Sequence, residues 1–221
     1  MQPFTFKTRR AEIHLRGAES DDIPRLIELN KKAFPLMVEE NVVWSERQLA
    51  NHLKLFPDGQ ILAEVDGQIV GAVASLIVTS GRDPYRAHTY AGITDGGYFH
   101  NHDASGDTLY GADVYVDPGW QGRGVGAALY EARRRLCRNL NLRRILAGGR
   151  LASYADYAEK ITIEAYVEKV RSGELQDPVL SFQLKEGFSV RGILHNYITD
   201  PKSLNHASLI EWLNPEYVEH E

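Results

Sequence analysis

Three glycines within residues 113–127 are the side-chain pattern of this chain that most directly points to chemistry. Gly122, Gly124 and Gly126 alternate after a β-rich run that closes at Pro118, and an amphipathic helical pattern follows. Glycines let the backbone approach a ligand closely, and the free amides and positive dipole end of a helix start stabilise anions. The spacing therefore predicts a strand, a loop and a helix start that together bind a phosphate or diphosphate.

Residues 122–127 also fit the G-x-G-x-x-A form of the dinucleotide-binding fingerprint. In that fingerprint the first glycine follows the strand almost directly, and a carboxylate about twenty residues later binds the ribose. Here residues 117–121 intervene, and the next β-rich run, residues 144–149, is flanked by Arg143 and Arg150. No P-loop lysine followed by Ser or Thr is present either. These departures disfavour a dinucleotide-dependent oxidoreductase and a nucleoside triphosphatase.

Read as Gln121-x-x-Gly124-x-Gly126 after a Val-Tyr-Val-Asp-Pro strand end, the segment resembles motif A of the GNAT N-acetyltransferase superfamily. The order of predicted elements extends this resemblance over residues 11–213. A narrower resemblance, carried by residues 106–113 and 178–183, is to the acetyltransferase module often fused to a nitrilase-type carbon–nitrogen hydrolase. The resemblance implies an α/β fold with a mixed central sheet, mostly antiparallel with a splayed parallel pair, flanked by helices.

The function that the resemblance implies is transfer of an acetyl group from acetyl-CoA, as cosubstrate, to a primary amine by direct attack in a ternary complex. Motif A would hold the pyrophosphate, and the pantetheine arm would bond the exposed backbone of the central strand. The residues that the resemblance and the glycine loop place at the cofactor are Val114, Tyr115, Val116, Gln121, Gly122, Arg123, Gly124, Val125, Gly126, Ala127 and Gln183.

The chain departs from the family pattern near the expected thiol, where the family reads Asn-x-x-Ala-x-x-Phe-Tyr-x-Lys-x-Gly-Phe. The matching positions are Phe182, Lys185, Gly187 and Phe188. Gln183 stands where the family has the tyrosine often proposed as the acid for the leaving thiolate, and Gln176 replaces the asparagine. A glutamine amide is not a useful proton donor. The proton donor for the thiolate stays open among Tyr154, Tyr157 and Tyr166. The glutamine at position 183 also motivates an alternative function, an acyl-CoA-binding regulatory module with little catalysis.

The proton acceptor for the amine is open among Tyr110 and Asp113 on the central strand and His102 on the preceding loop. That loop, residues 81–106, is too long for a simple connection, and we expect it to form part of the acceptor pocket. The side chains expected to line it are Tyr98, Phe99, His100, His102 and Asp103. No third well-spaced ligand accompanies the two histidines, so we expect no metal.

Hydrophobic periodicity and turn signals predict the elements that must position these residues. Ser45 begins a capping box, and Asp66-Gly67 is a two-residue hairpin signal. The arginines of the long helix after the glycine loop, Arg133 among them, are expected on a solvated basic face. The predicted strands cover residues 12–16, 60–65, 68–78, 108–116, 144–149, 188–194 and 207–213, and the main helices begin near residues 21, 46, 125, 162 and 178.

Composition narrows the class of protein. The 221 residues with 43% hydrophobic content suit one domain, residues 1–221. Cys137 is the one cysteine, so no intrachain disulfide forms, and the polar first ten residues do not resemble a signal peptide. A net charge of −5 opposes nucleic-acid binding and mildly favours a cationic amine. We expect a cytoplasmic enzyme without a membrane or nucleic-acid partner, acting on a small-molecule amine rather than a peptide.

Overall fold

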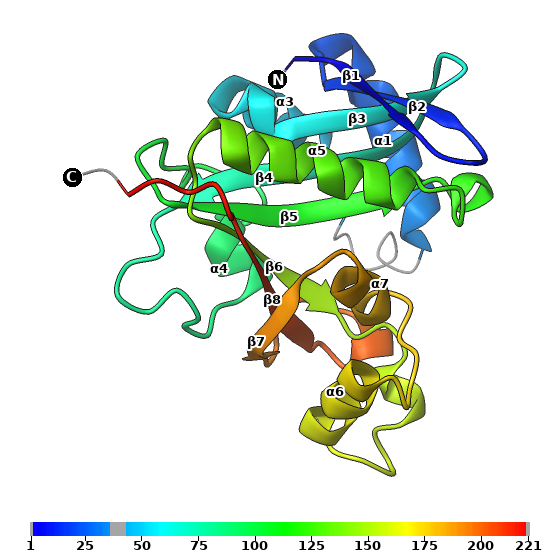
Figure 1. Ribbon diagram of the computed structural model, residues 1–221, viewed down its shortest axis with the longest axis vertical. Helices are drawn as coiled ribbons and strands as arrows, with labels where there is room; N and C mark the ends of the chain where they lie inside the picture. Colours follow the sequence, from blue (N-terminus) through cyan, green and yellow to red (C-terminus); the bar gives the residue numbers. More distant parts are fainter. Residues whose placement is uncertain (1, 36–42, 220–221) are drawn as a thin grey trace.

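An eight-stranded mixed sheet forms the centre of the computed structural model, which describes residues 2–35 and 43–219 (Figure 1). The strand order is β1-β2-β3-β4-β5-β6-β8-β7, and β5–β6 is the parallel pair while the other pairs are antiparallel. This arrangement confirms the predicted fold class. The strands are β1 (Phe4–Lys7), β2 (Glu12–Gly17), β3 (Gln60–Val65), β4 (Gln68–Val78), β5 (Thr108–Val116), β6 (Arg144–Arg150), β7 (Ser189–Leu194) and β8 (Ala207–Leu213).

Local sequence explains most of these strands, with one exception at the edge. Asp66 and Gly67 both have positive φ, 49° and 74°, as the tight β3–β4 hairpin requires. The first strand, β1, was missed, because four residues carry too little alternation to stand out. It pairs with β2, in the register Phe4 to Leu15, and Phe4 and Phe6 pack against the core.

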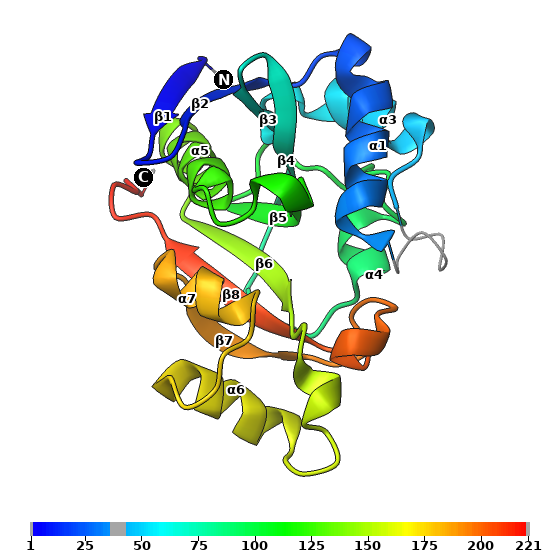
Figure 2. The same ribbon diagram turned by 90° about the vertical axis from the view of Figure 1, so that its right-hand side faces the viewer.

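Helices cover both faces of the sheet (Figure 2). On one face α5, α6 and α7 share a core with the sheet, and on the other α1, α3 and α4 close a second core. Side-chain caps begin α3 and α6. The hydroxyls of Ser45 and Thr162 accept hydrogen bonds from the backbone amides of Gln48 and Ala165, respectively. The helices are α1 (Ile23–Ala33), α3 (Glu46–Leu55), α4 (Tyr90–Thr94), α5 (Val125–Asn139), α6 (Ile163–Ser172) and α7 (Leu180–Lys185).

The parallel pair is splayed, and this opens the sheet. β5 and β6 pair only over Thr108–Tyr110 and Arg144–Leu146, and the two strands then diverge (Figure 2). Beyond those positions the described residues show no further pairing between them. The second half of β5 therefore has no strand partner on the side that faces β6.

A buried arginine fills the irregular part of β5. The β4–β5 register shifts between Ala74 and Ser75, so β5 carries an extra residue, a β-bulge. Nη2 of Arg133 donates to the carbonyls of Ala74 and Asp113 (3.2 and 2.6 Å), and Nε donates to Oγ of Ser75 (3.1 Å). The expectation that Arg133 lies on a solvated face was wrong. The bulge presents backbone carbonyls to which the buried guanidinium of Arg133 donates hydrogen bonds. Arg133 is only 2% exposed.

Candidate active site

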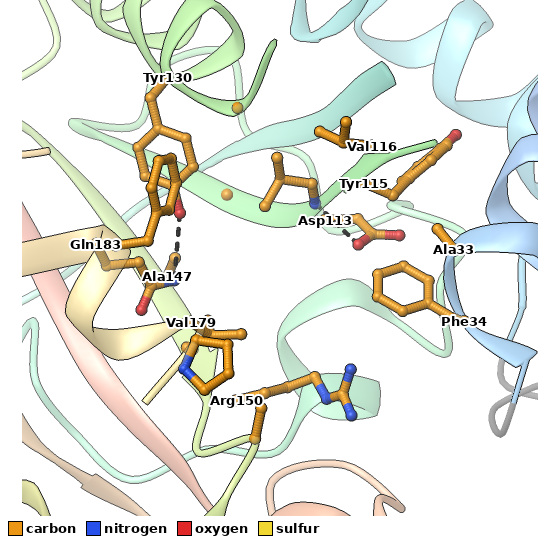
Figure 3. Close-up of a pocket in the computed structure, with 18 of the residues that line it drawn as sticks. Ala33, Phe34, Asp113, Tyr115, Val116, Tyr130, Ala147, Arg150, Val179 and Gln183 are labelled. Atoms are coloured by element: carbon orange, nitrogen blue, oxygen red, sulfur yellow. Dashed lines mark hydrogen bonds between the residues drawn. The ribbon is translucent and has the colours of Figure 1, made fainter. Parts of the chain in front are cut away.

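A cavity of about 1120 Å³ lies between the diverging strands (Figure 3). Its walls come from the second half of β5, the glycine loop with the start of α5, the end of β6, α7 and the end of α1. Asp113 and Phe34 lie on one side of the opening in Figure 3, and Gln183 and Tyr130 lie on the other. Segments far apart in the sequence thus meet around one space.

The glycine loop forms one end of the cavity. Gly122 and Gly124 have positive φ, 71° and 92°, a backbone that other residues adopt only with strain. α5 begins at Val125 and its first intrahelical bond is that of Ala128, so the preceding amides are free for an anion. A β-carbon on Gly126 would lie 3.1 Å from Cζ of Phe182, so this glycine keeps the passage between α5 and α7 open.

The first hairpin braces this loop from behind. Thr8, in the β1–β2 turn, donates its hydroxyl hydrogen to the carbonyl of Arg123 (3.2 Å), and Nη1 of Arg10 donates to the carbonyl of Gly122 (3.1 Å). A β-carbon on Gly124 would lie 2.6 Å from Cγ2 of Thr8. The missed strand β1 therefore helps to hold the shape of the glycine loop.

On the α7 side, a glutamine and a tyrosine point toward each other (Figure 3). Nε2 of Gln183 donates to the hydroxyl of Tyr130, at 3.2 Å, and both side chains are buried. Oε1 of Gln183 has no hydrogen-bond partner among the described residues, and a β-carbon on Gly149 would collide with it. Burial raises the pKa of Tyr130 above its ordinary value, so the hydroxyl stays protonated at neutral pH. The pair presents one O–H donor and one unfilled acceptor.

The opposite end of the cavity holds a carboxylate. Oδ2 of Asp113 accepts from Nε1 of Trp44 (2.8 Å) and Nδ2 of Asn30 (3.2 Å), and Oδ1 accepts from the amide of Val114 (2.8 Å). Burial raises the pKa of Asp113 to about 6, against these hydrogen bonds and the nearby Arg133. The carboxyl is therefore mostly ionised at neutral pH, and it suits an ammonium group.

Most of the residues expected at the cofactor do line this cavity. Val114, Tyr115 and Val116 lie on β5, and Gln183 lies on α7. The members from the glycine loop are Gln121, Gly122, Gly124, Gly126 and Ala127. Two others do not reach the wall: Val125 is buried in the core, and Arg123 stacks over the ring of Trp120, 4.8 Å from its centroid.

Of the three candidate proton acceptors, Asp113 alone lines the cavity. Tyr110 is buried behind the wall, and its hydroxyl lies 2.9 Å from that of Tyr197, which does line it. His102 lies away from the cavity, because its Nδ1 accepts from the amide of Ile77 (3.0 Å) and its ring stacks on Phe56.

The loop before β5 contributes less to the cavity than expected. Tyr90 of α4 lines the cavity, whereas the five predicted lining residues do not. Phe99 stacks on His52 in the core, and Tyr98 stacks on His100 at the surface. The loop packs against the protein instead of the cavity, because Phe99 contacts His52 of α3 and His102 bonds Ile77 of β4.

The tyrosines proposed from sequence as the acid lie elsewhere. None of Tyr154, Tyr157 and Tyr166 lines the cavity, and Tyr166 donates to Oδ2 of Asp177 at 2.8 Å, which ties α6 to the start of α7. Sequence reasoning missed Tyr130. A signal was available, because Gly126 and Tyr130 are four residues apart and share one face of α5.

Arg150 was also missed as a cavity residue. It ends β6, lines the cavity and binds the buried carboxylate of Asp200 through Nε and Nη2 (2.8 and 2.9 Å). Its guanidinium carbon lies 5.8 Å from the centroid of the Phe34 ring, across the opening. An arginine that follows a strand has no local pattern that marks it as a cavity residue.

The arrangement fits a coenzyme A-like ligand. A free strand edge suits an amide-containing arm, the glycine loop suits a diphosphate, and the unfilled Oε1 of Gln183 suits an amide donor. Within residues 2–35 and 43–219, no group of three or more potential metal-ligating side chains gathers. In the same ranges no helix is long and apolar enough to cross a membrane.

Comparison with known proteins identifies the family. Residues 23–160 match the model of the acetyltransferase (GNAT) family. "Probable hydrolase YhcX" of Bacillus subtilis (strain 168) is 42% identical over 205 residues, which cover 92% of this chain and 39% of that protein. "Uncharacterized N-acetyltransferase YkwB" of the same organism is 40% identical over 203 residues, which cover 92% of this chain and 89% of that protein. The chain thus spans well under half the length of the first relative and most of the second.

A solved structure shares the fold. The GNAT-like decarboxylase GphF in complex with isobutyryl-CoA superposes with a TM-score of 0.77 at 23% identity, covering 90% of this chain and 98% of that one. At that identity the likeness concerns the fold alone.

Proposed function

The chain belongs to the acetyltransferase (GNAT) family, and from that membership we propose that it transfers an acetyl group from acetyl-CoA to a primary amine. One observation carries the proposal: the free edge of β5 leads directly from the glycine loop to a cavity end that holds Asp113. A ligand held along this edge would have its diphosphate at one end and its acyl group near the carboxylate.

We assign the cofactor contacts to three parts of the chain. Amides at the start of α5 would bind the diphosphate, the backbone of Val114 to Val116 would bond the pantetheine arm, and Gln183 would accept an amide hydrogen through Oε1. When bound, acetyl-CoA supplies the acetyl group as a reactive thioester. Phe182 and Val179 of the α7 region would exclude water from the arm.

Two side chains have chemistry suited to the reaction, one to bind the acceptor and one to donate a proton. Asp113 binds the ammonium form of the acceptor, because its carboxylate is ionised at neutral pH and faces the cavity. Tyr130 donates the proton that the departing thiolate needs, since its hydroxyl oxygen accepts from Gln183 and its own hydrogen stays available. Tyr130 on α5 thus takes the part that the family gives to a tyrosine at position 183.

The acceptor that we favour is a small amine. The cavity that Asp113 faces is also lined by Tyr90, Tyr197 and Ile198, and by Asn30 and Phe34 at the end of α1. Aromatic rings and a carboxylate together suit a compact organic ammonium ion, which gains charge pairing and cation–π contact.

The test is release of CoA thiol from acetyl-CoA in the presence of a panel of amines: benzylamine, spermidine, lysine and a peptide with a free N-terminus. Acetylated benzylamine or another small amine, identified by mass spectrometry, supports the proposal. Release with the peptide alone would reassign the acceptor class. Tight CoA binding with no thiol release from any amine would favour the regulatory acyl-CoA-binding module instead.

A second candidate is loss of carbon dioxide from an acyl-CoA that carries a free carboxylate. Arg150 supports it, because it places a guanidinium in the cavity, and the fold is shared with the GNAT-like decarboxylase. Malonyl-CoA incubated without amine separates the two reactions. Conversion to acetyl-CoA together with an inactive amine panel would replace acetyl transfer by decarboxylation.

A further inference from the structure

Three side chains form a hydrogen-bonded row that leads away from the cavity. Tyr197 lines the cavity, and its hydroxyl lies 2.9 Å from the hydroxyl of Tyr110. The Tyr110 hydroxyl lies 2.8 Å from Nε2 of His88, in the segment between β4 and β5. The two tyrosines are buried and His88 is half-buried, so the row connects the cavity wall to the side of the molecule that water reaches.

The direction of each hydrogen bond follows from the histidine. Nδ1 of His88 lies 2.9 Å from the carbonyl oxygen of Arg86, which can only accept, so Nδ1 carries a hydrogen. Burial lowers the pKa of His88 below its ordinary value, so the ring is neutral at neutral pH and Nε2 is an acceptor. Tyr110 therefore donates to His88, and Tyr197 donates to Tyr110. The Tyr197 oxygen keeps a lone pair for a donor inside the cavity.

Packing holds the row in place at the amine end of the cavity. A β-carbon on Gly148 would collide with the Tyr197 ring, and the amide of Tyr90 donates to the carbonyl of Tyr197 (2.7 Å). The His88 ring meets the rings of Tyr110 and Tyr197 edge-on, with centroids 5.5 and 6.0 Å apart. Burial raises the pKa of Tyr197, against the hydrogen bond with Tyr110, so this hydroxyl stays protonated at neutral pH.

We propose that Tyr197, Tyr110 and His88 form a relay that carries one proton from the acceptor amine to solvent, an inference that rests on the proposed acetyl transfer. The amine nitrogen loses a proton to the Tyr197 oxygen as the hydrogen of Tyr197 passes to Tyr110 and that of Tyr110 passes to Nε2 of His88. The resulting imidazolium loses its Nδ1 hydrogen to water, because Nε2 faces the buried Tyr110. Turning of the ring, which lets water take the Nε2 hydrogen and return one to Nδ1, and rotation of the two hydroxyls then restore the starting arrangement. Tyr197 touches the substrate, whereas Tyr110 and His88 act through it.

The functional test compares three variants with a matched control, using acetyl-CoA and the best amine of the panel. His88→Gln keeps an oxygen that can accept from Tyr110 but cannot take up a proton, His88→Ala leaves room for free imidazole, and Tyr197→Phe breaks the row at the cavity. Each lowers kcat by about 100-fold with CoA affinity unchanged in calorimetry. Added imidazole restores His88→Ala and not His88→Gln. The control His14→Gln, at an exposed position on β2, keeps full activity. Full activity in His88→Gln, or absence of imidazole rescue, overturns the relay.

A second measurement needs no substrate. ¹⁵N NMR of the ring nitrogens should show neutral His88 with its hydrogen on Nδ1 in the wild type, and loss of that preference in Tyr110→Phe. A wild-type ring with its hydrogen on Nε2 overturns the relay even if the enzyme acetylates amines. Conversely, failure of every amine in the panel removes the proposed function while the position of this hydrogen still decides whether the row has the required polarity.

Discussion

At the scale of single residues, the glutamine at position 183, where the family pattern has a tyrosine, is the main chemical departure of this chain from that pattern. Gln183 occupies the position where the family has an acidic hydroxyl, and the hydroxyl of Tyr130 reaches the same point from α5. The two side chains are hydrogen-bonded, and we propose that the Tyr130 hydroxyl supplies the donor that position 183 lacks. A close packing of Phe182 and Phe188 around the Tyr130 ring fixes this geometry.

Removing the hydroxyl of Tyr130 tests this exchange. Tyr130→Phe keeps the ring packing and should lower kcat about 100-fold while CoA affinity stays the same, because only the proton donor is lost. Gln183→Ala is the companion variant. It should weaken CoA binding more than it changes the pH profile, since the amide positions and does not titrate. Steady-state kinetics over a pH series, together with calorimetry, make the measurement. A shifted pH limb in Gln183→Ala, or an unaltered kcat in Tyr130→Phe, contradicts the assignment.

The carboxyl of Asp113 should make stability depend on pH. Burial raises its pKa to about 6, whereas an unfolded aspartate has a pKa of about 3.9. Between these values the folded protein binds more protons, so this group's contribution to stability is full below about pH 4 and is lost as the pH rises through about 6. Relative to the wild type, Asp113→Asn should therefore gain up to about 3 kcal/mol in unfolding free energy between about pH 4 and about pH 7. Urea unfolding across this range measures it, and a pH-independent difference would refute it.

At the scale of elements, the glycine loop and the start of α5, which we propose bind the diphosphate, contain two distinct kinds of glycine. Gly124 has positive φ and touches Thr8, so a side chain there strains the loop itself. Gly126 is helical and faces Phe182 across the passage. Gly126 is therefore the cleaner probe of ligand binding.

Gly126→Asp should bind CoA at least about 100-fold more weakly, because it narrows the passage and adds negative charge beside the free amides of α5. Gly126→Ala separates bulk from charge and should have the smaller effect. Phe182→Ala combined with Gly126→Ala restores space and should recover part of the affinity. Calorimetry with CoA on variants whose circular dichroism matches the wild type provides the measurement. Unchanged affinity in Gly126→Asp would remove the cradle from the binding site.

At the scale of the whole molecule, the sheet has two parts that meet over only a short ladder. β1 to β5 form one part and β6, β8 and β7 form the other, joined at Thr108–Tyr110 and Arg144–Leu146. The cavity lies between the two parts, with the glycine loop on one side and α7 on the other. A ligand that spans it contacts both and couples them.

CoA binding should therefore protect both parts at once. Hydrogen exchange should slow in the glycine loop and in α7, while α6 exchanges as before, because no residue of α6 lines the cavity. At a free CoA concentration of about 100 times Kd, the stabilisation is about 2.7 kcal/mol. Exchange mass spectrometry and thermal unfolding with and without CoA test this. Protection limited to the glycine loop would show that the ligand does not bridge the parts.

The sequence by itself determined the glycine loop, the strand before it and the helix after it, because these depend on short-range features: φ preferences, capping and hydrophobic period. The mixed fold class followed from the family resemblance that this segment carries. Asp113 was located because it lies on the strand before the loop, and Gln183 was located by its position in the family pattern. Only the tertiary structure decided which side chains share the cavity. Tyr130, Arg150 and Tyr197 come from three separate segments of the chain, and their meeting depends on where β5 and β6 diverge. Tertiary contacts also hold His102 outside the cavity, and sequence could not reveal them because its partners Ile77 and Phe56 are distant in sequence. Periodicity records which face of an element is buried, but not which neighbour it is buried against.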